Sequence, residues 1–183
     1  MSRRLTLVLG GVRAGKSRYA QELAGDGGRV LFVATAEPGD EEMAARIAAH
    51  RAERPATWST LEEPIDLVTA LTPLVPDFDT VLIDCLTLWV SNLLLQDPDR
   101  EGTPAHIQTQ ARRLIDLYER SDVSWIVVSN EVGLGVIPTT RLGRDFADGL
   151  GRVNQQFAAA ADDVVVMFAG LPVNLKTPGP QGR

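Results

Sequence analysis

The stretch Gly10-Gly11-Val12-Arg13-Ala14-Gly15-Lys16-Ser17 decides the fold of this chain, because it fits the pattern G-x-x-x-x-G-K-[ST]. An apolar run at residues 5–9 leads into the stretch, and a helical pattern at residues 16–24 follows it. A strand, a glycine-rich turn and the start of a helix together form a cradle for phosphate groups. The alternative is a chance match in a glycine-containing turn, and the two flanking elements argue against it.

The residues of this loop have separate chemical tasks. Gly10, Gly11 and Gly15 carry no Cβ and can adopt positive φ, so the backbone can approach phosphate oxygens closely. Lys16 is expected to reach the β- and γ-phosphates of a nucleoside polyphosphate, and the Ser17 hydroxyl to bind Mg²⁺. Backbone N–H groups at the helix N-terminus would face the anion. The loop residues expected to bind the nucleotide are Gly10, Gly11, Val12, Arg13, Ala14, Gly15, Lys16 and Ser17.

Composition places the chain among ordinary globular proteins. Its 183 residues correspond to about one domain, and its hydrophobic content of 44% is sufficient for a core. The net charge of −6 argues against a nucleic-acid partner, because such proteins usually show a basic stripe. No apolar run approaches the roughly 20 residues needed to span a bilayer. The single cysteine, Cys85, lies in an apolar stretch, and a free thiol fits a reducing cytoplasm, where we expect the protein to act.

Apolar runs typical of strands alternate with helical patterns along the chain. The expected strands lie at residues 5–9, 30–34, 80–85, 125–129 and 164–169, with a short one near 57–61. The expected helices span residues 16–24, 40–54, 64–74, 86–95, 104–120 and 141–161. Near-continuous apolar strands indicate a parallel sheet that is buried on both faces. Residues 173–176 are expected to return as an antiparallel edge strand.

This order of elements predicts an α/β three-layer sandwich with right-handed crossovers, the P-loop NTPase fold of the RecA-like kind. The sheet is expected to be mainly parallel. One catalytic domain should cover residues 1–176, because no linker, repeat or low-complexity segment interrupts the chain, and residues 177–183 should form a flexible tail.

An acidic residue, Asp84, ends the apolar strand expected at residues 80–85. In sheets that bind nucleotide phosphates, an acid in this place holds Mg²⁺ beside the hydroxyl of the phosphate loop. The other interpretation is an aspartate that merely ends a strand. The phosphate loop upstream favours the metal site, which would then consist of Ser17 and Asp84.

One of the two histidines, His50, lies in a segment that reads as a helix at residues 40–54. The guanidinium groups of Arg46, Arg51 and Arg54 would keep its imidazole neutral, and therefore nucleophilic, near pH 7 and would attract phosphate. A partly exposed histidine without a role is the alternative for a single histidine on a helix.

Several stretches together carry a family resemblance. They are Gly-Gly-x-Arg-x-Gly-Lys-Ser at residues 10–17, Glu-Met-Ala-x-Arg-Ile-x-x-His-Arg-x-x-Arg-Pro-x-x-Trp within residues 40–58, the strand that ends at Asp84, and residues 129–138 and 151–155. In this order and over essentially the whole chain, they resemble the bifunctional adenosylcobinamide kinase/adenosylcobinamide-phosphate guanylyltransferase family. The His-Arg-x-x-Arg-Pro-x-x-Trp block is much more specific than the phosphate loop alone.

The resemblance implies two reactions in the assembly of the cobalamin nucleotide loop. A nucleoside triphosphate, ATP or GTP, phosphorylates the aminopropanol hydroxyl of adenosylcobinamide. GTP then guanylylates the enzyme on a histidine, which matches His50, and the adenosylcobinamide phosphate accepts the GMP. Lys16, Mg²⁺ and the loop N–H groups would stabilise the polyphosphate leaving group. The resemblance also implies a homotrimer in which neighbouring subunits help to build the site.

The resemblance further implies which residues outside the phosphate loop line the nucleotide, beside Asp84. Glu62 offers the acceptor that guanine recognition requires, and its other interpretation is an exposed carboxylate without a role. The implied residues are Ala34, Thr35, Ala36, Arg51, Ala52, Glu53, Arg54 and Glu62.

Other functions stay open at this point. A plain small-molecule kinase would use the same loop without labelling itself. A nucleotide-switched binding or motor module of the RecA-like kind would need a polymer partner, against which the acidic charge speaks. A catalytically silent ATP sensor would bind without turnover.

Some residues carry only general expectations. Asn130 and Glu131 follow a strand at the sheet edge where ligands gather, and they could sense the γ-phosphate, cover the corrinoid or simply form a turn. Trp89 lies in a helix that is apolar on nearly every side, which hints at burial between subunits. His106, in a polar loop region, is interpreted as a bystander. The three tryptophans, Trp58, Trp89 and Trp125, are expected in the core or an interface.

Overall fold

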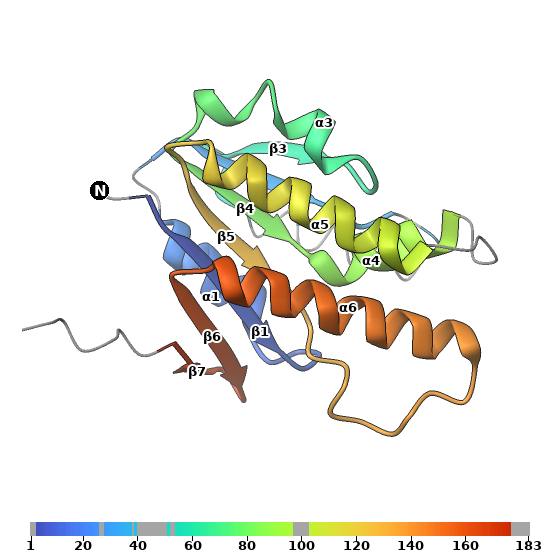
Figure 1. Ribbon diagram of the computed structural model, residues 1–183. Coiled ribbons are helices and arrows are strands. Elements are labelled where there is room, and N and C mark those ends of the chain that lie inside the picture. The colour runs from blue at the N-terminus through green and yellow to red at the C-terminus, as the bar shows by residue number, and fades with distance from the viewer. Residues whose placement is uncertain are drawn as a thin grey trace, which may run out of the picture.

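The computed structural model describes residues 3–25, 28–37, 39, 51, 54–96 and 103–176 of the chain. Most of the expected helix at residues 40–54 and the expected tail at residues 177–183 lie outside this part. Seven described strands form one sheet in the order β3-β2-β4-β5-β1-β6-β7 (Figure 1). They are β1 (Leu5–Gly10), β2 (Val30–Ala34), β3 (Ser59–Glu62), β4 (Thr80–Asp84), β5 (Ser124–Val128), β6 (Asp163–Phe168) and β7 (Leu171–Asn174).

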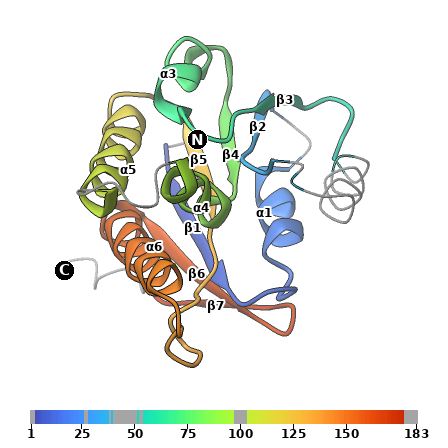
Figure 2. The ribbon, with the colours of Figure 1, turned by 90° about the vertical axis from the view of Figure 1, so that its right-hand side faces the viewer.

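Helices cover both faces of the sheet. They are α1 (Lys16–Ala24), α3 (Leu67–Leu71), the 3₁₀ turn η1 (Val75–Asp77), α4 (Leu86–Gln96), α5 (Thr103–Glu119) and α6 (Arg141–Ala160). In Figure 2, α1 lies on one side of the strands, whereas α5 and α6 lie on the other. No helix in the described part of the chain is long and apolar enough to cross a bilayer. These layers confirm the predicted α/β sandwich.

The sheet is parallel except at one edge, where β6 and β7 pair antiparallel, as predicted. Successive side chains along each central strand enter two different cores, because they alternate between the faces of the sheet. Leu7 and Ile83 belong to the core that also contains α4, α5 and α6. Val8 and Leu82 belong to the core that contains Ala20 of α1. Burial on both faces explains why these strands read as continuous apolar runs.

The antiparallel edge strand lies two residues earlier than predicted, at Leu171–Asn174 instead of residues 173–176. Ala169 and Gly170 have positive φ angles of 50° and 83°. They reverse the chain directly after β6, so that Leu171 already pairs with Phe168. Pro172 has no N–H group to donate. Strand β7 tolerates it because an edge strand has a hydrogen-bonding partner on one side only.

The helix predicted at residues 64–74 is too long, because α3 covers only Leu67–Leu71. Two acidic side chains bind the backbone N–H groups at its start. Glu63 accepts hydrogen bonds from the N–H groups of Ile65 and Asp66, and Asp66 accepts one from Thr69 at 3.2 Å. The helix therefore begins after its N-cap, Asp66. The 3₁₀ turn η1 was not predicted, and the remaining described strands and helices begin and end within two residues of the predicted positions.

Strands β1 and β5 are parallel neighbours, and the connections that follow them run over opposite faces of the sheet. The chain runs from β1 through α1 to β2 on one side, and from β5 through α6 to β6 on the other (Figure 2). Such a reversal opens a crevice at the carboxyl ends of the two strands, which is where α/β sheets bind ligands. The phosphate loop follows β1, so the fold places it at this switch point.

Gly10, the last residue of β1, lies against the neighbouring strand β6. Its φ is +144°, and a Cβ at this position would lie 2.7 Å from the backbone oxygen of Met167. A backbone oxygen cannot rotate away as a side chain can. A Cβ at Gly11, in contrast, would meet nothing within 4 Å. Only the first of the two glycines is therefore required by packing.

We expect Gly10→Ala to lower the free energy of unfolding by about 1–3 kcal/mol, through the clash with β6 and the strained φ. Gly11→Ala is the matched control and should change it by less than about 0.5 kcal/mol. The measurement is the urea midpoint of each variant at an unchanged slope. Equal midpoints for the two variants would contradict this packing argument.

Candidate functional site

The phosphate loop ends in a buried lysine that lies against its own backbone. Lys16 is only 9% exposed, and its Nζ donates a hydrogen bond to the carbonyl oxygen of Gly11 at 2.7 Å. Burial lowers the pKa of this ammonium group, and the nearby Cys85 and Asp84 oppose the shift. Gly15 stands at the N-cap of α1 and has no side chain to cap the helix. The first N–H groups of α1 therefore have no side-chain partner at the N-cap and can bind an anion.

Backbone hydrogen bonds from both neighbouring strands hold the loop in place. The N–H of Gly170, in the turn between β6 and β7, donates to the carbonyl of Ala14 at 3.1 Å. The N–H of Glu131, which follows β5, donates to the carbonyl of Gly10 at 3.3 Å. Arg13 has a φ of 58°, in the left-handed region that turns the chain tightly. The loop shape is thus fixed by the sheet around it.

Asp84 ends β4 and is half-buried, two strands away from the phosphate loop. Its charge acts on two cations, because it raises the pKa of both Lys16 and Arg54 against the effect of their burial. Mg²⁺ is usually held by one or two carboxylates or hydroxyls together with substrate phosphates and water. A pair of oxygen donors, the Ser17 hydroxyl and the Asp84 carboxylate, fits that chemistry.

A partly buried arginine lies on an aromatic ring near Asp84. The guanidinium carbon of Arg54 is 3.8 Å from the ring centroid of Phe32, and the Phe32 ring also stacks with Trp58 at 6.5 Å. Burial is the main reason why the pKa of Arg54 is lowered. Its buried Nε and Nη1 have no hydrogen-bond partner, and neither does Nε1 of Trp58, among the residues that the structure describes. Such donors call for an anionic or carbonyl-bearing ligand.

The end of β2 is tied to the end of β4 by a buried hydroxyl. Oγ1 of Thr35 donates to the carbonyl of Cys85 at 2.7 Å and accepts from the N–H of Cys85 at 2.9 Å. Asn92 of α4 donates to the carbonyl of Thr35 at 2.8 Å. Thr35 is fully buried, so its side chain fixes this corner, while the adjacent Ala36 is half-exposed.

Two further residues implied for the nucleotide form an ion pair with each other. Arg51 donates to Glu62 at the end of β3. The Arg51 side chain is 59% exposed and the Glu62 side chain 50%. Ala34, at the end of β2, is buried. His50, Ala52 and Glu53 lie outside the described residues. The expectation that His106 lies in a loop is wrong, because it is an exposed residue of α5.

Sequence reasoning gave no role to a buried polar network behind the crevice. Asn154 of α6, which is 5% exposed, accepts a hydrogen bond from Oγ of Ser129 at 2.7 Å and donates to the carbonyl of Asn130 at 3.0 Å. The N–H of Asn130 donates to Oγ1 of Thr87 at 2.8 Å. Residues 151–155 are part of the family resemblance, but no function was expected for them. The structure shows that Asn154 anchors the segment after β5.

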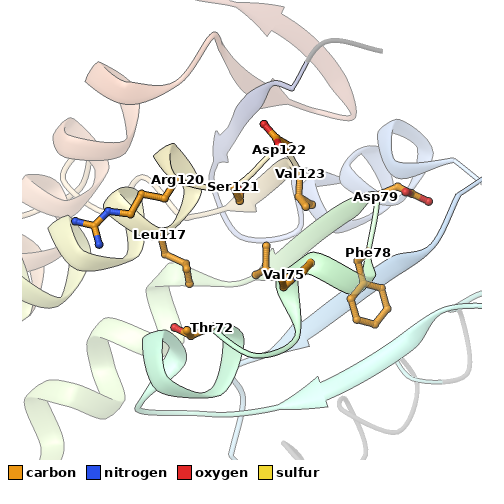
Figure 3. Close-up of a pocket in the computed structure, with 10 residues that line it drawn as sticks. Thr72, Val75, Phe78, Asp79, Leu117, Arg120, Ser121, Asp122 and Val123 are labelled. Atoms are coloured by element: carbon orange, nitrogen blue, oxygen red, sulfur yellow. The ribbon is translucent and has the colours of Figure 1, made fainter.

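A hollow of about 560 Å³ opens elsewhere, beside η1 and the end of α5 (Figure 3). Its lining includes Phe78 and Asp79, which precede β4, and Asp122 and Val123, which precede β5. These are the amino-terminal ends of the strands, at the edge of the sheet opposite to the phosphate loop. Ligands of such sheets bind at the carboxyl ends, so this hollow is not the nucleotide site.

Comparison with known proteins agrees with this geometry. The model of the family described as cobinamide kinase / cobinamide phosphate guanyltransferase matches residues 6–175. The bifunctional adenosylcobalamin biosynthesis protein CobP of Pseudomonas aeruginosa is 44% identical over 171 residues, which are 93% of this chain and 96% of that protein. The protein CobU of Salmonella typhimurium, described in the same terms, is 43% identical in an alignment 181 residues long that covers 94% of this chain and 99% of that protein.

The fold also resembles a solved structure of different sequence. The crystal structure of the RadB recombinase has a TM-score of 0.51 and 17% identity, and the match covers 90% of this chain and 74% of that one. At this identity the likeness concerns the fold alone, and it confirms the RecA-like arrangement.

We expect Asn154→Ala to lower the free energy of unfolding by about 2 kcal/mol, because the buried Ser129 hydroxyl and Asn130 carbonyl lose their partner. The neighbouring Gln155 is exposed on the same helix. Gln155→Ala is the control and should stay within about 0.5 kcal/mol of the parent protein. Urea unfolding measures both, and a loss no larger for Asn154→Ala than for the control would count against the network.

Proposed function

Because the chain belongs to the cobinamide kinase / cobinamide phosphate guanyltransferase family, we propose that its single phosphate loop serves both reactions of that family. The protein is a bifunctional adenosylcobinamide kinase and adenosylcobinamide-phosphate guanylyltransferase of adenosylcobalamin biosynthesis. The observation that carries the proposal is the place of Lys16 at the β1–β5 switch point, buried and within the field of Asp84. The nucleoside triphosphates are ATP or GTP for the first reaction and GTP for the second.

In the kinase reaction, the aminopropanol hydroxyl of adenosylcobinamide attacks the γ-phosphorus and a nucleoside diphosphate leaves. Lys16 gives up its hydrogen bond to Gly11 and donates to the β- and γ-phosphate oxygens, where negative charge is concentrated. N–H groups of Gly15, Lys16 and Ser17 at the start of α1 hold the same phosphates. The transition state is loose, so this positioning supplies most of the catalysis.

In the guanylyl transfer, an imidazole nitrogen of His50 attacks the α-phosphorus of GTP. A bond forms between nitrogen and phosphorus, the bond from phosphorus to the bridging oxygen breaks, and pyrophosphate leaves with the electron pair. An oxygen of adenosylcobinamide phosphate then attacks the same phosphorus and releases the histidine. Lys16 stabilises the departing pyrophosphate, as covalent catalysis requires.

Arg54, which follows His50 in the chain, supports this assignment. The Nε and Nη1 atoms of Arg54 are buried without a partner in the described part of the chain. Its guanidinium is therefore available for phosphate oxygens, which planar donors of this kind hold well. For guanine, the acceptor is Glu62, which must first leave its ion pair with Arg51. Ala34, Thr35, Ala36, Ala52 and Glu53 complete the nucleotide site.

Mg²⁺ is the proposed cofactor, held by Ser17 and Asp84 together with the phosphates. When bound, it neutralises charge that develops on the phosphate oxygens. The pairing of one hydroxyl and one carboxylate at the crevice supports this choice.

The proposed assembly is a homotrimer in the cytoplasm. Exposed apolar side chains in the segment after β5 and in the hairpin of β6 and β7 support contact with another copy of the chain, because burial of apolar surface favours association. They are Leu134, Val136, Ile137, Phe168 and Leu171, each at least 60% exposed.

Incubation with Mg²⁺ and GTP labelled at the α-phosphate tests the covalent step. We expect denatured protein to retain the label through an acid-labile, alkali-stable bond. His50→Ala should lose the label completely, because its side chain has no nucleophile, and chelation of the metal should also prevent labelling. Label retained by His50→Ala would contradict the assignment of His50, and unlabelled parent protein that still binds GTP would point to a plain kinase.

Sedimentation equilibrium tests the assembly. We expect a particle of three times the chain mass of 19.8 kDa. Leu134→Asp and Phe168→Asp should shift it toward the monomer, because a charge in an apolar contact loses hydration. A monomer of the parent protein at micromolar concentration would contradict the trimer.

A further inference from the structure

Glu131 stands at the switch point beside the phosphate loop. Strand β5 lies between β1, which leads into the loop, and β4, which ends at Asp84. Residues that follow β5 therefore emerge between the two. The backbone N–H of Glu131 donates to the carbonyl of Gly10 at 3.3 Å, so this residue is fixed to the first glycine of the loop.

Buried polar side chains fix the position of Glu131 from behind. Asn154 and Thr87 bind the backbone of Asn130, and Ser129, fully buried, binds Asn154. Burying such groups costs free energy unless each finds its partner, and a complete network defines one geometry. Here the network defines the two residues directly before Glu131, so the start of its side chain has a defined place in the crevice.

The carboxylate of Glu131 is half-buried and forms no ion pair within the described part of the chain. Its one hydrogen bond there is from the N–H of Gly133, at a long 3.4 Å. A carboxylate without a cation would repel the triphosphate bound next to it. The Glu131 carboxylate fits the site if a hydroxyl group lies between the carboxylate and the γ-phosphate, because a hydroxyl can donate a hydrogen bond to a carboxylate.

We propose that Glu131 is the general base of the kinase reaction. The acceptor hydroxyl gives its proton to the Glu131 carboxylate while its oxygen forms a bond to the γ-phosphorus. The bond between that phosphorus and the β–γ bridging oxygen breaks, and the nucleoside diphosphate takes the electron pair. Glu131 then releases the proton to water. Guanylyl transfer uses a phosphate oxygen and an imidazole as nucleophiles, so it needs no such base.

This inference rests on the proposed function, and the two reactions of the enzyme allow it to be tested separately. Glu131→Gln keeps the size of the side chain and its acceptor for the Gly133 N–H but removes its basicity. We expect kcat for phosphorylation of adenosylcobinamide to fall about 100-fold, the lower end of general-base effects, with KM for both substrates little changed. Transfer of GMP from GTP to supplied adenosylcobinamide phosphate should keep its parent rate, which also reports that the variant is folded.

Two further variants complete the test. Glu131→Asp retains a carboxylate and should keep more kinase activity than Glu131→Gln. Glu22→Gln, at an exposed position near the C-terminal end of α1 where Glu22 pairs with Arg18, should leave both reactions unchanged. Kinase activity of Glu131→Gln near the parent value, a parallel loss of both reactions, or recovery of the kinase at raised Mg²⁺ would each overturn the inference. Absence of both reactions in the parent protein would instead overturn the proposed function.

Discussion

The parallel pairing of β1 with β5 is the constraint on which the site depends. These neighbours send their connections to opposite faces of the sheet, through α1 after β1 and through α6 after β5. The phosphate loop after β1 and the segment after β5 therefore lie side by side at the edge of the sheet where such folds bind ligands, and the N–H of Glu131 donates to the carbonyl of Gly10. The residues that we assign to phosphoryl transfer itself follow or end three neighbouring strands of the sheet: Lys16 and Ser17 follow β1, Glu131 follows β5, and Asp84 ends β4.

The charged side chains near the phosphate loop favour the binding of an anion. Lys16 and Arg54 are both partly removed from water, which lowers the pKa of each, and Asp84 only partly offsets this. Around Asp84, two desolvated cations share one carboxylate, which favours a bound anion beside them. A polyphosphate with Mg²⁺ would supply the missing counter-charge. Because we assign Lys16 to both reactions, we expect phosphorylation and guanylylation to alternate in the site of one subunit.

Sequence patterns predicted the elements of the fold but not their order in the sheet. Apolar runs and the glycine-rich motif located β1, β4 and β5 because burial on two faces leaves a clear signal. The start of α3 was missed since it depends on which backbone groups Glu63 and Asp66 bind. The order of the strands depends on the crossover connections between them, which no local sequence pattern encodes. The roles of Asn154 and Thr87 escaped for the same reason, because their partners are distant in sequence.

Within the candidate site, motifs identified residue types, and the structure added their surroundings. Lys16 was predicted from its motif alone. The stacking of Arg54 on Phe32 joins residues that are 22 positions apart, and no spacing rule predicts it. Thr35 was expected near the nucleotide, and the structure shows that its hydroxyl is already engaged by Cys85.

The hydrogen bonds that hold the phosphate loop to its neighbours run from backbone to backbone, through Gly170 to Ala14 and Glu131 to Gly10. Side-chain changes at the surrounding surface leave such bonds intact. An exposed side chain away from the loop, such as Gln155 on α6, can therefore change in an engineered protein while the loop keeps its shape. The scaffold can therefore drift widely in surface sequence and still hold phosphate in the same way, because main-chain groups keep the loop in place.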